Sequence, residues 1–435
     1  MIVPTQRFLG TLAALLVLGV AAALWPGVEP SFVLAATVLG GVVLLDAATV
    51  ARSPRLTAHR FVPSSLPVGV WQPVALRLSN GGRGVRRIRL YDHHPPGFDT
   101  RGLPQAQRVA AGQWVEIRYE VRPLERGEHH FGRIEGRLRS HLGLWERKTW
   151  LGAAGVTRVY PNFAALTKYA LFATDQRLSQ IGVLQRRRRG EGLDFHQLRE
   201  YREGDAQRQI DWKATARSRK LISREYQDER DQQVVFVIDC GRRLAARDGE
   251  LAHFDHLLNA ALLLAYVGLR QGDAVGLLTV GGHSRFMAPR KAAATVNVML
   301  NLLYDLQPTL LTTDYYAAAL ELTRRIRKRA LIVFLSNLRD EDEDTLGPAL
   351  GLLARRHLVL FASLREAILG RALSARVDSF ERALTHAAAA DYLRQRALAF
   401  RRVEARGVLA LDVEPAQLPV ALVNRYLDIK RAGRL

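Results

Sequence analysis

The stretch Val234-Val235-Phe236-Val237-Ile238-Asp239 is a run of β-branched and aromatic residues that ends in a carboxylate. An unbroken apolar run of this length is typical of a strand covered on both faces, as in a parallel sheet. Asp239 comes at the carboxyl end of this strand, where the binding sites of open α/β sheets lie. The stretch therefore predicts a doubly wound α/β domain with its site beside Asp239.

Strand and helix patterns alternate from this stretch to the end of the chain. Apolar runs predict further strands at residues 274–280, 330–335, 357–362 and 408–413, and a short edge strand at 285–288. Helical periodicity predicts helices at residues 251–270, 292–304, 314–327 and 340–355, and then long helices up to residue 406. This order is typical of a doubly wound sheet, and we assign residues 231–435 to the domain.

In the sequence before this domain, apolar and polar residues alternate with a period of two residues. Within residues 55–165, segments such as 74–78 and 114–119 alternate apolar and polar residues, and turn sequences such as Pro95-Pro96-Gly97 separate them. Short strands at this spacing predict a β-sandwich-like domain. We assign residues 166–230 to a separate charged segment. From Arg186 to Asp231 charges of both signs are closely interleaved, which favours internal ion pairs over a track for phosphates.

The first 54 residues contain two apolar runs, residues 8–24 and 31–50, and the second is broken only by Asp46. Each run is close to the ~20 residues that cross a bilayer. Arg7 precedes the first run and Arg52, Arg55 and Arg60 follow the second, while the connecting turn has no basic residue. The positive-inside rule then predicts a transmembrane hairpin, residues 1–54, with both termini and all soluble parts in the cytosol.

The alternative for these runs is a cleaved signal peptide followed by an apolar strand. We favour the hairpin, because no small-residue cleavage site stands near Trp25-Pro26 and the second run follows at once. The single cysteine, Cys240, excludes an intrachain disulfide and fits a reducing compartment.

The net charge of +21 raises the question of a nucleic-acid partner. All but seven of the 63 basic residues are arginine, a skew that with abundant Ala and Leu indicates a GC-rich genome. We therefore predict no nucleic acid, and a basic surface also suits an anionic membrane leaflet. Neither a nucleotide-binding glycine loop nor a zinc-protease or serine-hydrolase motif occurs, so we predict no cofactor and no enzyme.

Residues 198–217, which contain Glu200-Tyr201, Gly204-Asp205 and Ile210-Asp211-Trp212, resemble the signature of the "domain of unknown function 58" family, and the resemblance extends over nearly the whole chain. It implies a multi-pass protein of the bacterial inner membrane with a von Willebrand factor A-like domain. It also implies a companion, a MoxR-type AAA+ ATPase. A function inferred from this companion ATPase rests on analogy with the family.

The signature residues have two interpretations. The first is a structural clamp, in which arginine–carboxylate forks tie this segment to the following sheet. The second is a docking surface around Trp212 and Arg217, residue types that are frequent at binding hot spots. We favour the clamp, made of Glu200, Tyr201, Gly204, Asp205, Arg208, Asp211, Trp212 and Arg217.

The resemblance also implies a position for a metal site. A von Willebrand A-like domain holds a divalent cation through Asp-x-Ser-x-Ser, a later Thr and a later Asp. Asp239 and Thr313 match this pattern, but Gly241, Arg243 and Asn337 replace the two serines and the last Asp. Magnesium needs oxygen ligands, so we predict that the site binds no metal and that Arg243 or Arg242 pairs with Asp239 instead.

Three functions follow in order of preference. The first is a non-enzymatic, membrane-anchored adaptor that binds a protein partner through Asp239, Gly241, Arg243, Thr312, Thr313 and Asn337, with Trp212 and Arg217 as a second patch. The second is a magnesium-dependent binding module of the A-like type. The third is a hydrolase hidden in the charged signature, for which no nucleophile–base pair stands out.

Overall fold

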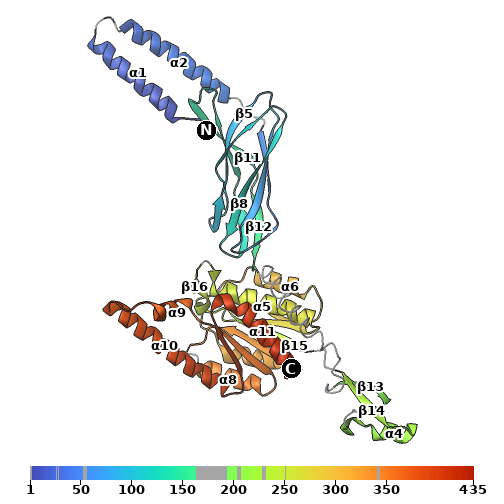
Figure 1. Cartoon of the computed structure of the whole chain (residues 1–435). Helices are drawn as coiled ribbons and strands as arrows, with labels where there is room; N and C mark the ends of the chain where they lie inside the picture. Colours follow the sequence, from blue (N-terminus) through green and yellow to red (C-terminus); the bar gives the residue numbers. More distant parts are fainter. Residues whose placement is uncertain are drawn as a thin grey trace. The chain divides into compact units, whose positions relative to one another are not determined.

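The computed structural model of the chain describes residues 2–25, 27, 29–51, 56–162, 194–202, 207–227, 232–249, 251–339 and 343–435 (Figure 1). The chain divides into two compact units, Met1–Tyr160 and Pro161–Leu435. Within the described residues, the first unit contains two helices and a set of mostly antiparallel sheets, and the second contains a mostly parallel sheet with helices on both faces.

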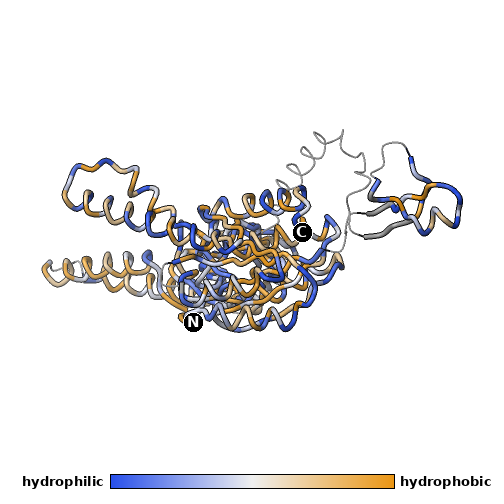
Figure 2. The backbone as a smooth tube through the Cα atoms, turned by 90° about the horizontal axis from the view of Figure 1, so that it is seen from below, coloured by the Kyte–Doolittle hydropathy of each residue, from blue (hydrophilic) through white to orange (hydrophobic). Residues whose placement is uncertain are grey.

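The two N-terminal helices, α1 (Gln6–Leu24) and α2 (Glu29–Ala51), are long and apolar enough to cross a membrane, with a mean hydropathy of 2.1 each. Their large apolar side chains are exposed along their length, for example those of Leu16, Leu34 and Leu44. The hydrophobic colouring in Figure 2 follows both helices. A soluble protein seldom exposes such a continuous apolar surface.

Asp46, the one charge inside the second apolar run, is buried where α2 meets the sheets. Its carboxylate accepts hydrogen bonds from Ser140 Oγ at 2.5 Å and from the backbone N–H groups of Leu142 and Leu144. Arg147 donates hydrogen bonds to the last carbonyl groups of α2, those of Val50 and Ala51. A basic group at a helix C-terminus interacts favourably with the helix dipole. Asp46 therefore fixes the C-terminal end of α2 to the β-structure.

The β-structure of the first unit has two larger sheets and a small one. One sheet has the order β1-β11-β10-β5-β7, with β1 Ile2–Pro4, β11 Trp145–Gly152, β10 Ile134–Arg139, β5 Arg86–Asp92 and β7 Gln105–Val109. The second has the order β2-β4-β8-β6, with β2 Leu56–Phe61, β4 Gln72–Asn80, β8 Trp114–Pro123 and β6 Phe98–Arg101. The third contains β3 Ser65–Pro67, β12 Gly155–Tyr160 and β9 Gly127–Phe131.

A buried polar cluster connects the two larger sheets. Arg60 on β2 donates to both carboxylate oxygens of Asp92 on β5, and Tyr119 OH on β8 donates to the same carboxylate at 2.5 Å. Burial, together with the charge of Asp92, raises the pKa of Tyr119 far above its usual value. Arg60, which the sequence suggested as a charge flanking the membrane span, is therefore an internal partner of Asp92.

The second unit contains a six-stranded sheet in the order β19-β18-β15-β20-β21-β22, parallel except for β19. Its strands are β15 Gln233–Asp239, β18 Ala274–Val280, β19 Phe286–Arg290, β20 Leu331–Ser336, β21 Leu358–Leu364 and β22 Leu409–Val413. The chain fills one side of β15 first and then crosses to the other side, as in a doubly wound sheet. The mixed α/β fold class and the predicted strands are thus confirmed.

Helices cover both faces of this sheet and form a hydrophobic core on each. Successive residues of β15 point alternately into one core and the other. Val234, Phe236 and Ile238 pack with α5 (His253–Arg270), α6 (Thr295–Leu303) and α11 (Leu418–Arg431). Val235 and Val237 pack with α7 (Tyr315–Arg325), α8 (Glu343–Ala354) and α10 (Phe380–Glu404). Residues 234–239 are therefore all buried, which explains the unbroken apolar run.

The last helix, α11, was not predicted. It packs along α5, where Tyr426 OH donates to Asp273 and Lys430 Nζ lies 2.7 Å from Asp273 Oδ1. The remaining elements are β16 Arg247–Asp248, β17 Leu251–Ala252, α9 Ala367–Ser374, and an arm formed by β13 Asp194–Glu200, α4 Trp212–Ser218 and β14 Ile222–Gln227.

Asp92→Asn tests the polar cluster of the first unit. The substitution leaves the Arg60 guanidinium buried without its counter-charge, so we expect a loss of about 3 kcal/mol or more in unfolding free energy. Urea unfolding of the full-length chain in detergent, followed by tryptophan fluorescence, measures it, because five of the six tryptophans lie in this unit.

Asp99→Asn is the matched control, since Asp99 pairs with Arg122 but its side chain is 43% exposed. An exposed pair contributes less than about 1 kcal/mol. Equal losses for the two variants would contradict the role assigned to the cluster.

Candidate functional site

The candidate site lies at the carboxyl end of β15. This strand is inside the sheet, with β18 on one side and β20 on the other. Loops that follow β15, β18 and β20 meet there, since the carboxyl ends of parallel strands share one edge. This edge is where α/β sheets bind ligands. Asp239, Thr313 and Ser336 come together at this point.

Four donors of the chain itself surround the Asp239 carboxylate, which is 2% exposed. One oxygen, Oδ1, accepts from Gly241 N at 2.7 Å and from Thr313 Oγ1 at 2.5 Å. The other, Oδ2, accepts from Tyr315 OH at 2.9 Å and from Ser336 Oγ at 2.6 Å. A buried carboxylate needs such partners, and four of them come from the chain here.

Two glycines make room for Thr313 beside Asp239. A Cβ atom added at Gly241 would lie 2.7 Å from Thr313 Oγ1 and 3.0 Å from Asp239 Oδ1. Gly281, with φ at +77°, would also collide with Thr313 Oγ1 if it carried a Cβ atom. The serine that the A-like pattern places at position 241 therefore does not fit this arrangement unless the Thr313 loop moves.

The predicted pair between Asp239 and Arg243 or Arg242 is wrong. Both carboxylate oxygens of Asp239 are occupied by hydroxyl and backbone donors. Arg242 and Arg243 instead lie in the short helix Arg242–Ala245 that follows, and the backbone N–H of Arg242 donates to Leu311 O. Hydroxyl groups are small and neutral enough to enter this buried corner, whereas a guanidinium group would require further acceptors.

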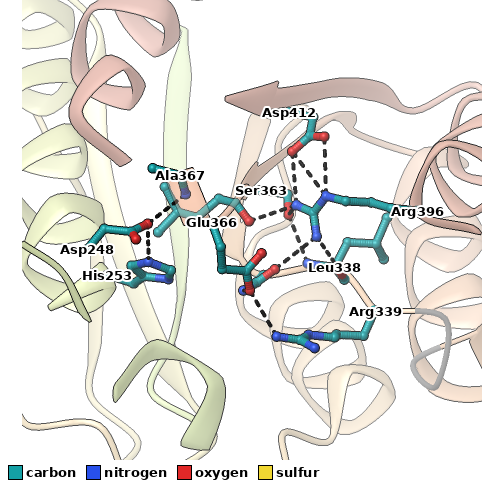
Figure 3. A network of polar contacts seen from close by, with 11 residues as sticks. Asp248, His253, Leu338, Arg339, Ser363, Glu366, Ala367, Arg396 and Asp412 are labelled. Atoms are coloured by element: carbon teal, nitrogen blue, oxygen red, sulfur yellow. Dashed lines mark hydrogen bonds and ion pairs between the residues drawn. The ribbon is translucent and has the colours of Figure 1, made fainter. Parts of the chain in front are cut away.

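Asn337, the third residue of the predicted metal position, belongs to the network around Arg396 and Glu366, which Figure 3 shows. Its side chain donates to Glu366 Oε1 at 2.9 Å and accepts from Arg396 on α10 at 3.0 Å. Arg396 is buried and also binds the carboxylate of Asp412 and Ser363 Oγ. This network ties α10 to the ends of β20, β21 and β22, so Asn337 has a structural role.

Asp248 and His253 form a smaller contact at the same edge (Figure 3). His253 Nε2 lies 3.0 Å from Asp248 Oδ2, which also accepts from Ala367 N. Burial alone would raise the pKa of Asp248, but the hydrogen bonds from Ala367 and His253 outweigh it and lower that pKa. Within the described residues, no group of three or more His, Cys, Asp or Glu side chains is placed to hold a metal ion.

Leu310 and Leu311 are the site residues that the sequence reasoning missed. They are 88% and 62% exposed, at the tip of the loop that carries Thr312 and Thr313. Thr309 fixes the base of this loop, since its N–H donates to Cys240 O at 2.7 Å and its hydroxyl to Gly281 O. An apolar pair flanked by threonines, Thr309 before it and Thr312-Thr313 after it, was the available signal.

The signature residues lie mainly on the arm. Asp211 caps α4, because its side chain accepts a hydrogen bond from Ala214 N. It also pairs with Arg224 on β14 at 2.8 Å. Both contacts lower the pKa of Asp211, and the hydrogen bond from Ala214 has the larger effect. Glu200 pairs with Lys220 at 3.0 Å, and Tyr201 N–H donates to Leu221 O. The Asp211–Arg224 pair therefore joins α4 to β14 within the arm.

Trp212 and Arg217, the predicted second patch, lie on α4. Trp212 is 68% exposed and Arg217 is also exposed, so both side chains are open to a partner. Gly204 and Asp205 lie outside the described residues, and only the backbone of Arg208 is described, in the turn Gln207–Gln209.

Gly241→Ala tests whether Thr313 fills the space beside Asp239. The added methyl group would force the Thr313 loop away, so we expect the unfolding free energy to fall by about 1–3 kcal/mol. Gly351→Ala on α8 is the control, because a Cβ atom there meets nothing within 4 Å and alanine favours a helix.

Urea unfolding of the full-length chain in detergent, followed by the helical circular dichroism signal, measures both variants. If Gly241→Ala were as stable as Gly351→Ala, the packing described for Thr313 would be refuted.

Comparisons with known proteins support the signature assignment. Residues 197–382 match a family described as "Protein of unknown function DUF58". Over 175 residues the chain is 24% identical to the uncharacterised protein YeaD of Bacillus subtilis, a match that covers 38% of this chain and 39% of YeaD. The chain thus spans about two fifths of the length of this curated relative.

Among solved structures, similarity is found to an aerotolerance-related membrane protein of Bacteroides fragilis, with 14% identity and a TM-score of 0.31, over 46% of this chain and 99% of that one. A FixG-related protein of Vibrio parahaemolyticus is similar over 25% of this chain and 98% of its own, with 11% identity and a TM-score of 0.18. The match of residues 197–382 to the DUF58 family confirms the resemblance for that part of the chain.

Proposed function

We propose that the chain is a non-enzymatic adaptor, anchored in the bacterial inner membrane, whose α/β domain binds a protein partner in the cytosol. The observation that carries this proposal is the exposed Leu310–Leu311 pair at the carboxyl edge of the sheet. The resemblance to the DUF58 family suggests the partner, an AAA+ ATPase of the MoxR type.

The loop that carries the two leucines is held in place by the site itself. Thr309 binds its base to Cys240 and Gly281, and Thr313 binds its far end to Asp239. A preorganised apolar tip loses little conformational entropy when a partner covers it. Thr312 and Arg242, both exposed, flank the leucines with polar groups, as at the rim of an interface.

Trp212 and Arg217 support a second contact on the arm. Tryptophan and arginine are the residue types that contribute most at protein interfaces. Because the Asp211–Arg224 pair fixes α4 to β14, the exposed Trp212 ring stands on a defined element. Two separated contacts on one chain would strengthen binding of a large partner.

The membrane anchor would concentrate such a partner at the inner leaflet. The exposed apolar surfaces of α1 and α2 require lipid, and the arginines outside the two apolar runs favour a cytosolic position for both termini. Asp46 fixes α2 to the β-structure, so the anchor and that domain form one body. The adaptor would then present its partner to substrates at the membrane.

A magnesium-dependent binding module is the second candidate. The close approach of Asp239 Oδ1 and Thr313 Oγ1, at 2.5 Å, brings together two oxygen atoms that a cation could share. Against it, both oxygens of Asp239 already accept hydrogen bonds from the chain. Chelation of metal during partner binding separates the two candidates.

The double variant Leu310→Ser, Leu311→Ser tests the adaptor. Removing two apolar anchors from an interface should weaken binding of the ATPase at least about tenfold. The measurement is the dissociation constant of the full-length chain in detergent with the MoxR-type ATPase of the same genome. Leu384→Ser on α10, with Leu384 62% exposed, is the matched control and should leave binding unchanged.

Binding by the wild-type chain should also be equal in EDTA and in magnesium. Unchanged affinity of the double leucine variant would remove this surface from the interface. Loss of binding in EDTA would favour the magnesium-dependent module, and turnover of a substrate by the chain alone would refute the non-enzymatic proposal.

A further inference from the structure

A strongly basic groove lies on the first unit, on the outer face of the sheet β1-β11-β10-β5-β7. Its volume is about 580 Å³, and no acidic residue is among its lining residues. The arginines that line it are Arg7, Arg86, Arg87, Arg89, Arg108, Arg137 and Arg139.

The strand register sets arginines directly opposite one another in this groove. Arg87 on β5 faces Arg108 on β7, and Arg89 on β5 faces Arg137 on β10. Like charges in directly opposed positions destabilise a sheet. A sheet that keeps two such pairs side by side has a basic surface that an anion would stabilise.

The nearby carboxylates neutralise only part of this charge. Glu135 binds Arg137 at 2.9 Å and Lys148 at 2.8 Å, and Glu146 lies near Arg137 and Arg139. Burial would raise the pKa of Glu135, but hydrogen bonds from Lys148, Arg137 and His93 lower it to about 2, so these partners stay bound at neutral pH.

Arg7, Arg87, Arg89 and Arg108, by contrast, have no ion pair with a carboxylate of the described residues. Several guanidinium groups without counter-charges, gathered around one groove, can bind a phosphate through bidentate hydrogen bonds. The chemistry of the groove is therefore that of a phosphate site.

The position of the groove indicates where the phosphate comes from. Arg7 lies in the first turn of α1 and reaches the loop at Gly143, and Arg86 Nη1 lies 3.5 Å from Thr49 O in the last turn of α2. The groove thus adjoins the ends of both apolar helices. If these helices cross a bilayer, this is the level of the lipid headgroups.

We propose that this groove binds the phosphate headgroup of an anionic phospholipid. The inference deepens the proposed function, on whose membrane anchor it rests. A basic pocket beside the cytosolic ends of transmembrane helices is where anionic headgroups bind. Bound lipid would neutralise the opposed arginine pairs and fix the β-domain at the membrane surface, because Asp46 already joins this domain to α2.

Calorimetric titration of the full-length chain in a nonionic detergent tests the headgroup site, with dihexanoyl phosphatidylglycerol as the probe and dihexanoyl phosphatidylcholine as its zwitterionic counterpart. We expect phosphatidylglycerol to bind at least about tenfold more tightly. The double variant Arg87→Gln, Arg108→Gln should weaken its binding at least about tenfold, since each basic residue near a phosphate contributes about 1 kcal/mol.

The matched control is Arg118→Gln, Arg158→Gln, which removes the same charge from two exposed arginines outside the groove lining. It should leave binding unchanged. Without lipid, the groove variant should unfold at the same or a higher urea concentration than the wild-type chain, because a repulsive pair is removed. A lower urea midpoint would give these arginines a structural role and overturn the proposal.

Equal binding of the two lipids, or equal weakening by groove and control variants, would also overturn it. Inorganic phosphate alone binding as tightly as phosphatidylglycerol would assign the groove to free anions, and a tighter complex with a short oligonucleotide would assign it to nucleic acid. Extraction of cell membranes with alkaline carbonate tests the anchor separately, since release of the chain would refute membrane insertion whatever the titration shows.

Discussion

The α/β domain depends on how the buried carboxylate of Asp239 is stabilised. A negative charge with almost no access to water requires several donors or a cation. Here Thr313, Tyr315, Ser336 and the backbone of Gly241 supply the donors. These contacts join the loop after β15, the start of α7 and the end of β20. The same contacts hold the Leu310–Leu311 tip in place, so the stability of the domain and its proposed binding surface have one origin.

In the first unit, Asp46 has a comparable role. A carboxylate inside an apolar helix would be unfavourable in lipid, but three donors from residues 140–144 satisfy it where the helix meets the β-structure. The groove arginines lie beside this junction. The charges near the helix ends thus have two roles. Asp46 joins α2 to the β-structure, and the groove arginines would bind the proposed headgroup.

Much of the fold could be predicted from the sequence, because unbroken apolar runs and strict alternation each have one physical cause. Strand β18, for example, has the predicted bounds, Ala274–Val280. Helix α11 was missed although its buried residues recur at helical spacing, namely Leu418, Leu422, Val423, Tyr426 and Ile429. The contact of Tyr426 with Asp273, by contrast, joins residues far apart in the chain and leaves no local pattern.

The candidate site was predicted in part for the same reason. The approach of Thr313 to Asp239 followed from the resemblance, whereas the donors Tyr315 and Ser336 depend on how α7 and β20 pack. The expected arginine partner failed because sequence proximity to Asp239 does not place a side chain in its buried corner. The basic groove was also missed, since it requires the register that brings Arg87 opposite Arg108.

The central claim is that Asp239 is satisfied by the chain itself and not by a cation. The most direct measurement is the thermal unfolding midpoint of the full-length chain in detergent, in 10 mM magnesium chloride and in EDTA with sodium chloride at equal ionic strength. A ligand that binds only the folded state at 100 times its dissociation constant adds about 2.7 kcal/mol of stability. The account predicts the same midpoint in both solutions. A midpoint that rises by several degrees with magnesium and saturates below 10 mM would contradict it.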